Sequence, residues 1–192
     1  MPLSRRALLC ALAGGAAAVV TLAGCDSGSA AQKPTPALSA GQAGFFGGTD
    51  LAWVEINIAM NEQLQPLLAL APGKASPAAQ AFAAQVQGFT DQELSALRQL
   101  HDQAKLPSEN PHEGMPMPGM VTPEQVSEAK AASGAAFDKL LLQRLKAHFD
   151  QGTSLATSEE KAGVEPQTLA LAKQVLTHRA DALKQLSGLT AA

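Results

Sequence analysis

From residue 49 to residue 189 the apolar residues recur at helical spacing, and this pattern restricts the chain to an all-α fold. No segment in this range alternates apolar and polar residues as a half-buried strand does, and β-branched residues are sparse. Ala, Leu and Gln dominate, and all three favour helix. We expect a short helix and four long ones, at 123–131, 49–71, 76–105, 134–161 and 166–187.

Local signals mark the ends of several of these helices. Ser76 followed by Pro77 is typical of an N-cap with proline at the first helical position, and the sequence from Thr122 to Gln125 forms a capping box. Gly188 is expected to cap the last helix. Pro66 lies inside the first helix, where it removes a hydrogen bond, so we expect a kink or a break there.

The two halves of this region resemble each other. Asp50 and Trp53 match Asp138 and Leu141 at an offset of 88 residues. Four further pairs match at an offset of 89: Phe82 with Leu171, Val86 with Val175, Leu94 with Leu183, and Leu97 with Leu186. Two helical hairpins, joined by a long crossover at 106–133, predict a four-helix bundle.

The N-terminal residues have the pattern of an export signal. Arg5 and Arg6 precede an apolar run at 7–23, and the run ends in the sequence Leu-Ala-Gly before Cys25. We interpret 1–24 as a lipoprotein signal peptide, 25–48 as a flexible tether and 49–189 as the bundle domain. Acylation of Cys25 then anchors an extracytoplasmic protein to the bacterial membrane; the alternative is an ordinary cleavage site. The paired arginines leave both the general and the twin-arginine export routes open.

Charge argues against a nucleic-acid partner. The chain has 14 basic and 17 acidic residues, and loss of the two signal arginines gives 12 − 17 = −5. No basic patch is apparent in the sequence, so nucleic acid is a poor candidate. The second cysteine, Cys10, lies inside the signal peptide, so the domain holds no disulfide.

Three polar residues fall on the apolar faces of the expected helices. Glu93 and Arg179 lie near the middle of the second and fourth long helices, and His148 lies near the middle of the third. Isolated charges there are costly, so Glu93 and Arg179 either pair across the core or extend outward to water. His178 is expected to face solvent. Met60 of the first helix is level with His148.

The residues also carry a resemblance to a known family. Gly119-Met120, the segment from Ser133 to Leu142, and Ala147-His148 resemble the second half of the family called domain of unknown function 305. Asp50, Trp53, Ile58 and Gln63 resemble its first half. The resemblance implies a ferritin-like four-helix bundle in a secreted or lipid-anchored bacterial protein. It also implies a methionine-rich crossover and an association with copper or other metals.

The chain departs from this family where a metal would bind. The family typically has paired histidines in the first and third helices, but Met60 and Asn61 stand at the first pair, and Phe149 follows the retained His148. On the other two helices, Thr90 with Glu93 and Arg179 with Ala182 stand where Gln-x-x-Glu elements are usual. The resemblance therefore implies a degraded core site, in which Glu93 and Arg179 replace the metal.

A second metal hypothesis concerns the crossover. Thioether sulfur suits Cu(I) and imidazole suits copper in either oxidation state, so a loop with one histidine and three methionines can bind copper. The candidate ligands are His112, Met115, Met117 and Met120. The alternative is that these methionines only cap the end of the bundle by apolar packing. His148 and Met60 form a separate candidate two-ligand site, or His148 is a hydrogen-bonded structural residue.

No enzymatic site is evident in the sequence. The Glu-x-x-His pairs of di-iron proteins are missing from the expected helices, and no Gly-x-Ser-x-Gly motif occurs. Two hypotheses remain. In the first, the protein binds or buffers copper, the one candidate cofactor, at the cell envelope. In the second, it is a metal-free structural or interaction bundle that docks another envelope protein.

Overall fold

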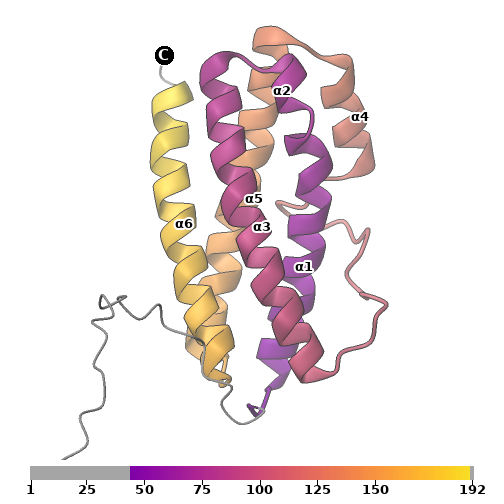
Figure 1. The fold of residues 1–192 in the computed structure, drawn as a ribbon, viewed down its shortest axis with the longest axis vertical. Helices are drawn as coiled ribbons and strands as arrows, with labels where there is room; N and C mark the ends of the chain where they lie inside the picture. Colours follow the sequence, from indigo (N-terminus) through magenta and orange to yellow (C-terminus); the bar gives the residue numbers. More distant parts are fainter. Residues whose placement is uncertain (1–43, 191–192) are drawn as a thin grey trace, which may run out of the picture. The chain divides into compact units, whose positions relative to one another are not determined.

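The structure, a computed structural model, describes residues 44–190. The predicted signal peptide at 1–24, Cys25 and most of the predicted tether lie outside the described residues. All regular structure within 44–190 is helical, which confirms the all-α prediction (Figure 1). The helices are α1 (Gly48–Leu68), α2 (Ala71–Lys74), α3 (Pro77–Ala104), α4 (Pro123–Ala131), α5 (Gly134–Ala162) and α6 (Pro166–Thr190).

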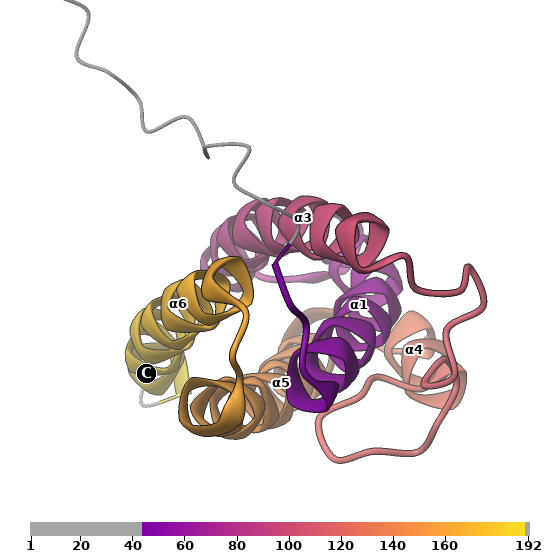
Figure 2. The ribbon, with the colours of Figure 1, turned by 90° about the horizontal axis from the view of Figure 1, so that it is seen from below.

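The four long helices form a closed bundle of two hairpins. α1 packs against α3, and α5 packs against α6; the two hairpins meet where α1 contacts α5 and α3 contacts α6 (Figure 2). The short helix α4 lies outside this ring, against α1 and α5. This arrangement is the four-helix bundle that the duplicated sequence predicts. Across the described residues, no helix has a stretch both long and apolar enough for a membrane span.

Helix boundaries follow the local signals closely, with a few differences. Ser76 and Thr122 cap α3 and α4 through their hydroxyl groups as predicted. Pro66 does not break the first helix, because α1 continues through it and ends two residues later, at Leu68. The short helix α2 that follows was not predicted from the sequence. The expectation for Gly188 is wrong, because α6 continues through it to Thr190.

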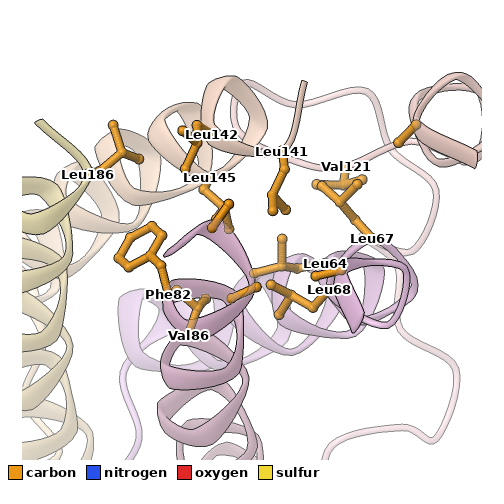
Figure 3. Close-up of a cluster of buried hydrophobic side chains, with 14 of the residues drawn as sticks. Leu64, Leu67, Leu68, Phe82, Val86, Val121, Leu141, Leu142, Leu145 and Leu186 are labelled. Carbon is orange, nitrogen blue, oxygen red and sulfur yellow. The ribbon is translucent and has the colours of Figure 1, made fainter. Parts of the chain in front are cut away.

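The apolar core consists of two main clusters at opposite ends of the bundle. The cluster near α2, shown in Figure 3, includes Leu64, Leu67, Phe82, Val86, Phe137, Leu141, Leu145 and Leu186. The cluster near the start of α1 includes Trp53, Val54, Ile58, Leu94, Leu97, Leu100, Leu171 and Val175. The middle third of the bundle, between these clusters, contains buried polar side chains and forms the candidate site.

Residues just before α1 lie against the bundle. The backbone N–H of Gly47 donates to Asp50 Oδ2 at 2.7 Å, and Phe46 packs against the cluster that contains Trp53. Residues 44–47, the end of the segment predicted as a tether, are therefore part of the packed structure.

Candidate functional site

Glu93 and Arg179 form an ion pair in the middle of the bundle. Arg179 donates from Nη1 to Glu93 Oε1 at 3.0 Å and from Nη2 to Oε2 at 2.7 Å. Both residues are about 1% exposed. The sequence left open whether these two residues pair across the core or extend into water. In the structure they pair across the core. Two parallel charge-assisted hydrogen bonds offset part of the cost of burying the charges.

Glu93 has two further partners. His178 Nδ1 lies 2.9 Å from Oε1, and Asn61 Nδ2 donates to Oε2 at 3.4 Å. Burial raises the pKa of Glu93, but the nearby charge of Arg179 and the hydrogen bond with His178 outweigh it, so the net pKa is below its ordinary value. His178 was expected to face solvent, but its side chain is only 25% exposed and its ring reaches the core carboxylate.

The guanidinium of Arg179 lies between aromatic rings and a glycine. Its Cζ is 5.2 Å from the centre of the Phe89 ring and 5.7 Å from that of Phe149. A Cβ atom at Gly152 would come within 2.9 Å of Arg179 Nε. Gly152 therefore provides the space that the large cation needs at this level of α5.

His148 is buried without a hydrogen bond. It is 1% exposed, and neither ring nitrogen has a partner among the described residues. Burial and repulsion by Arg179 lower the pKa of His148 to about 3, and they outweigh the negative charge of Glu93 and the backbone of Gly119, which raise it. The imidazole is therefore neutral at ordinary pH, with one nitrogen free to donate an electron pair. The two sequence-based alternatives for His148, a metal ligand and a structural residue held beside the backbone of Gly119, therefore both remain predictions.

Three methionines gather close to this level of the bundle. Met60 of α1 and Met120 of the crossover are 1% and 4% exposed, and they pack together with Ala59. The half-buried Met117 lies against the same cluster, beside Ile56 and Leu155. We call Met60, Met117 and Met120 the methionine cluster.

The methionine cluster differs from the two separate sites expected from the sequence. It joins Met60, which we assigned to a core site, with two methionines assigned to the loop site. Met115 is 45% exposed and His112 is half-buried, and neither belongs to the cluster. His148 is linked to it through the crossover, because the backbone of Gly119 approaches the imidazole and Met120 is the next residue.

Two side chains, one from α1 and one from the crossover, bind the crossover to α1. Asn110 Nδ2 donates to the carbonyl of Glu55 at 2.8 Å. The amide group of Gln63, oriented to satisfy both of its neighbours, accepts from Gly114 N at 2.8 Å and donates to Val121 O at 3.0 Å. The segment that contains Met117 and Met120 is thus tied to α1 on both sides.

A tight turn brings the crossover onto α5. Met120 N donates to Met117 O at 3.2 Å, and Gly119 has φ +75°, as in a type II turn with proline and glycine at its centre. A Cβ atom at Gly119 would lie 2.6 Å from Ala147 O and from Gln151 Cβ. Only glycine allows this approach, which places the loop beside the turn of α5 that carries His148.

A metal ion at this level of the bundle would need the methionine sulfurs as donors. No group of three or more His, Cys, Asp or Glu side chains within residues 44–190 is arranged to hold a metal ion. The thioethers of the methionine cluster are soft donors that suit Cu(I), and the neutral imidazole of His148 suits copper in either oxidation state.

The comparisons with known proteins concern the family and the fold. The sequence matches the family described as "Domain of unknown function (DUF305)" over residues 64–190, a range that starts after Asp50, Trp53 and Ile58. No curated protein matches the sequence. A crystal structure of a DUF305 protein from Streptomyces coelicolor, described as secreted, is similar with a TM-score of 0.67 and 17% identity; the match covers 74% of this chain and 92% of that one.

A second crystal structure, of a DUF305 fragment from Deinococcus radiodurans, has a TM-score of 0.67 and 12% identity. It covers 75% of this chain and 96% of the fragment. At these identities the two structures show the shared helical fold. Together with the sequence match over residues 64–190, they establish that this chain belongs to the DUF305 family.

Proposed function

We propose that this protein binds Cu(I) through the thioethers of Met60, Met117 and Met120, with His148 as a nitrogen donor. The observation that carries the proposal is the packing of Met60 with two methionines of the crossover. The free ring nitrogens of His148 add to it, because a buried imidazole without partners is costly unless a ligand uses it.

The charges near the cluster favour a monovalent ion. Arg179 repels cations, but Glu93 compensates its charge through two hydrogen bonds. The methionine donors are neutral, and so is His148, so the site adds no negative charge to balance a divalent ion. Cu(I) needs less charge compensation and prefers sulfur, so it fits this donor set better than Zn²⁺ or Cu²⁺.

We also propose an extracytoplasmic location, with the chain anchored to the membrane through acylated Cys25. The pattern of residues 1–25 supports export, and the related DUF305 protein of Streptomyces coelicolor is described as secreted. In this setting the bundle takes up or buffers copper at the cell envelope.

A competition titration tests copper binding. The purified protein, kept reduced and free of oxygen, is titrated with Cu(I) against a chromogenic chelator. We expect one Cu(I) to bind per chain, and the combined change of Met60, Met117 and Met120 to leucine to abolish binding. Met115→Leu is the matched control, because Met115 is exposed and outside the cluster, and it should leave affinity unchanged. Failure of the wild-type chain to compete at micromolar metal contradicts the proposal.

The second candidate function is a metal-free structural bundle that docks another envelope protein. The observation that favours it is the ion pair, because Arg179 already supplies a cation to the middle layer. This alternative expects the melting temperature to be the same with and without Cu(I), whereas a bound ligand raises it through mass action.

A further inference from the structure

Three acidic side chains are buried together at the end of the bundle where α1 begins and where α5 is joined to α6. They are Asp50 of α1, Glu159 in the last turn of α5, and Glu165 just before α6. Each is at most 1% exposed. None of the three belongs to the methionine cluster or to the proposed copper site.

Two of the three carboxylates accept hydrogen bonds from nearby donors. Asp50 accepts from the backbone N–H groups of Gly47, Val164 and Glu165, at 2.7, 3.0 and 3.1 Å. Glu165 Oε2 accepts from the backbone N–H and the hydroxyl of Thr168, at 2.6 and 2.9 Å. The hydrogen bonds to Asp50 favour its anionic form.

Glu159 has no such donors. Its carboxyl group lies against that of Asp50, and neither of its oxygens accepts a hydrogen bond from the described residues. The charged groups that face it are Asp50 and Glu165, and no ion pair within residues 44–190 includes any of the three. A third buried negative charge here would be unpaired, so Glu159 must carry a proton, which it donates to Asp50.

The ionisation behaviour agrees with this assignment. Burial, the hydrogen bond with Asp50, and the charges of Asp50 and Glu165 raise the pKa of Glu159 to about 8. Burial also raises the pKa of Asp50, but its hydrogen bonds with Glu159 and three backbone N–H groups bring the net value below its ordinary one. One proton is thus held between the two side chains up to mildly alkaline pH.

The chain that leads into the bundle rests on these carboxyl groups. Gly47 is bound by Asp50, and Gly44 approaches Glu165 so closely that a Cβ there would lie 2.7 Å from Oε1. Between them, Phe46 packs against the apolar cluster that includes Trp53. On the other side, Gly163 lies against Glu159, where a Cβ would overlap the carboxyl group.

We propose that Glu159 is a proton-operated latch, and that loss of its proton releases residues 44–47 and the turn between α5 and α6 from the end of the bundle. The turn between α5 and α6 lies directly against Glu159 through Gly163, and residues 44–47 lie against its neighbours Asp50 and Glu165, so we expect these segments to move aside when water reaches the ionised carboxylate. Because residues 44–47 join the bundle to the chain before it, the latch makes that connection tight at neutral pH and loose at alkaline pH.

Acrylamide quenching of the one tryptophan tests the latch. Trp53 is 3% exposed and shares its cluster with Phe46, and the chain has no tyrosine, so its fluorescence reports directly on this end of the bundle. We expect the quenching constant of the purified protein to rise at least twofold between pH 6.5 and pH 9.5, with a midpoint near 8. Glu159→Gln, which keeps a donor to Asp50 but cannot ionise, should abolish the rise.

Glu160→Gln is the control. Glu160 is next to Glu159 in the sequence but exposed, so its replacement should leave the pH profile of quenching as in the wild type. Circular dichroism at both pH values should show the same helix content, which separates latch opening from unfolding. A flat wild-type profile overturns the proposal whatever the variants do. A rise that persists in folded Glu159→Gln also overturns it, because another group, such as the terminal amine, is then responsible.

Discussion

Asp50 and Asp138 occupy equivalent positions in the two hairpins, and each binds the backbone N–H of the residue that precedes the second helix of the other hairpin. Asp50 Oδ1 accepts from Glu165 N at 3.1 Å, and Asp138 Oδ1 accepts from Ser76 N at 3.0 Å. The sequence duplication is therefore visible as a repeated contact that ties each hairpin to its partner. The two contacts differ in environment, since Asp50 is fully buried and Asp138 is not.

This difference predicts unequal losses of stability. Asp50→Ala leaves three backbone N–H groups without their acceptor, including the buried one of Glu165, and should lower the free energy of unfolding by about 3 kcal/mol. Asp138→Ala removes the acceptor of one half-buried N–H and should cost about 1 kcal/mol. Urea unfolding of both variants measures this. Equal losses would contradict the role assigned to burial.

The ion pair in the middle layer predicts strong coupling between its members. Arg179→Met leaves Glu93 charged and buried, and Glu93→Leu leaves the guanidinium in the same position, so each change should cost about 3–5 kcal/mol. The double variant removes both charges and should recover most of the loss. A double-mutant cycle from chemical denaturation gives the coupling. If the two single losses simply add, the pair is not an energetic unit.

Two helical glycines provide a matched test of packing around Arg179. A Cβ at Gly88 meets nothing within 4 Å, so Gly88→Ala should stabilise the protein by about 0.5–1 kcal/mol through helix propensity. A Cβ at Gly152 would come within 2.9 Å of Arg179 Nε, so Gly152→Ala should be destabilising instead. Thermal unfolding of the two variants should give shifts of opposite sign. Equal stabilisation at both positions would mean that Arg179 has room to move.

Burial of the neutral imidazole of His148 should make the free energy of unfolding sensitive to acid. The imidazole has a pKa of about 3 in the folded chain and an ordinary value of 6.5, so the unfolded chain takes up its proton first. The stability contributed by the neutral form is complete above pH 6.5 and is lost as the pH falls toward 3. His148→Phe should flatten the decline of the unfolding free energy in this window. A decline as steep as in the wild type would assign the acid sensitivity to other groups.

The turn at Gly119 is expected to control copper affinity, because it places Met120 beside α5. Gly119 and Gly114 both have positive φ values, +75° and +72°, but only a Cβ at Gly119 would collide with α5. Gly119→Ala should displace Met120 and weaken Cu(I) binding at least tenfold, whereas Gly114→Ala should change it little. The chelator competition described above measures both. Equal affinities for the two variants would show that the approach of Gly119 to α5 is not required.

Much of the fold could be predicted from the sequence because its signals are local. The helices beginning at Pro77 and Pro123 start where their caps indicate, and apolar spacing identifies the four long helices. The rise per residue along a helix predicts that Glu93 and Arg179 lie at the same level of the bundle. It does not decide whether they pair in the core or extend into water, so both alternatives stayed open.

The remaining features depend on contacts between distant segments. Helical spacing gives the direction of His178 only approximately, so its reach to Glu93 was missed. The course of the crossover depends on the close approach of Gly119 to α5, and periodicity carries no information about it. For the same reason, Met60 was assigned to one candidate site, and Met117 and Met120 to another. The burial of Glu159 was also missed, because its position near a helix end usually indicates a solvated side chain.

X-ray absorption at the copper edge identifies the atoms that bind Cu(I) in this protein. The protein is loaded with one equivalent of Cu(I), passed through a desalting column and measured without oxygen. We expect copper to be retained with two or three sulfur neighbours and one imidazole nitrogen, and Met60→Leu to remove one sulfur neighbour. Copper that is lost on the column, or that has only nitrogen and oxygen neighbours, would contradict it.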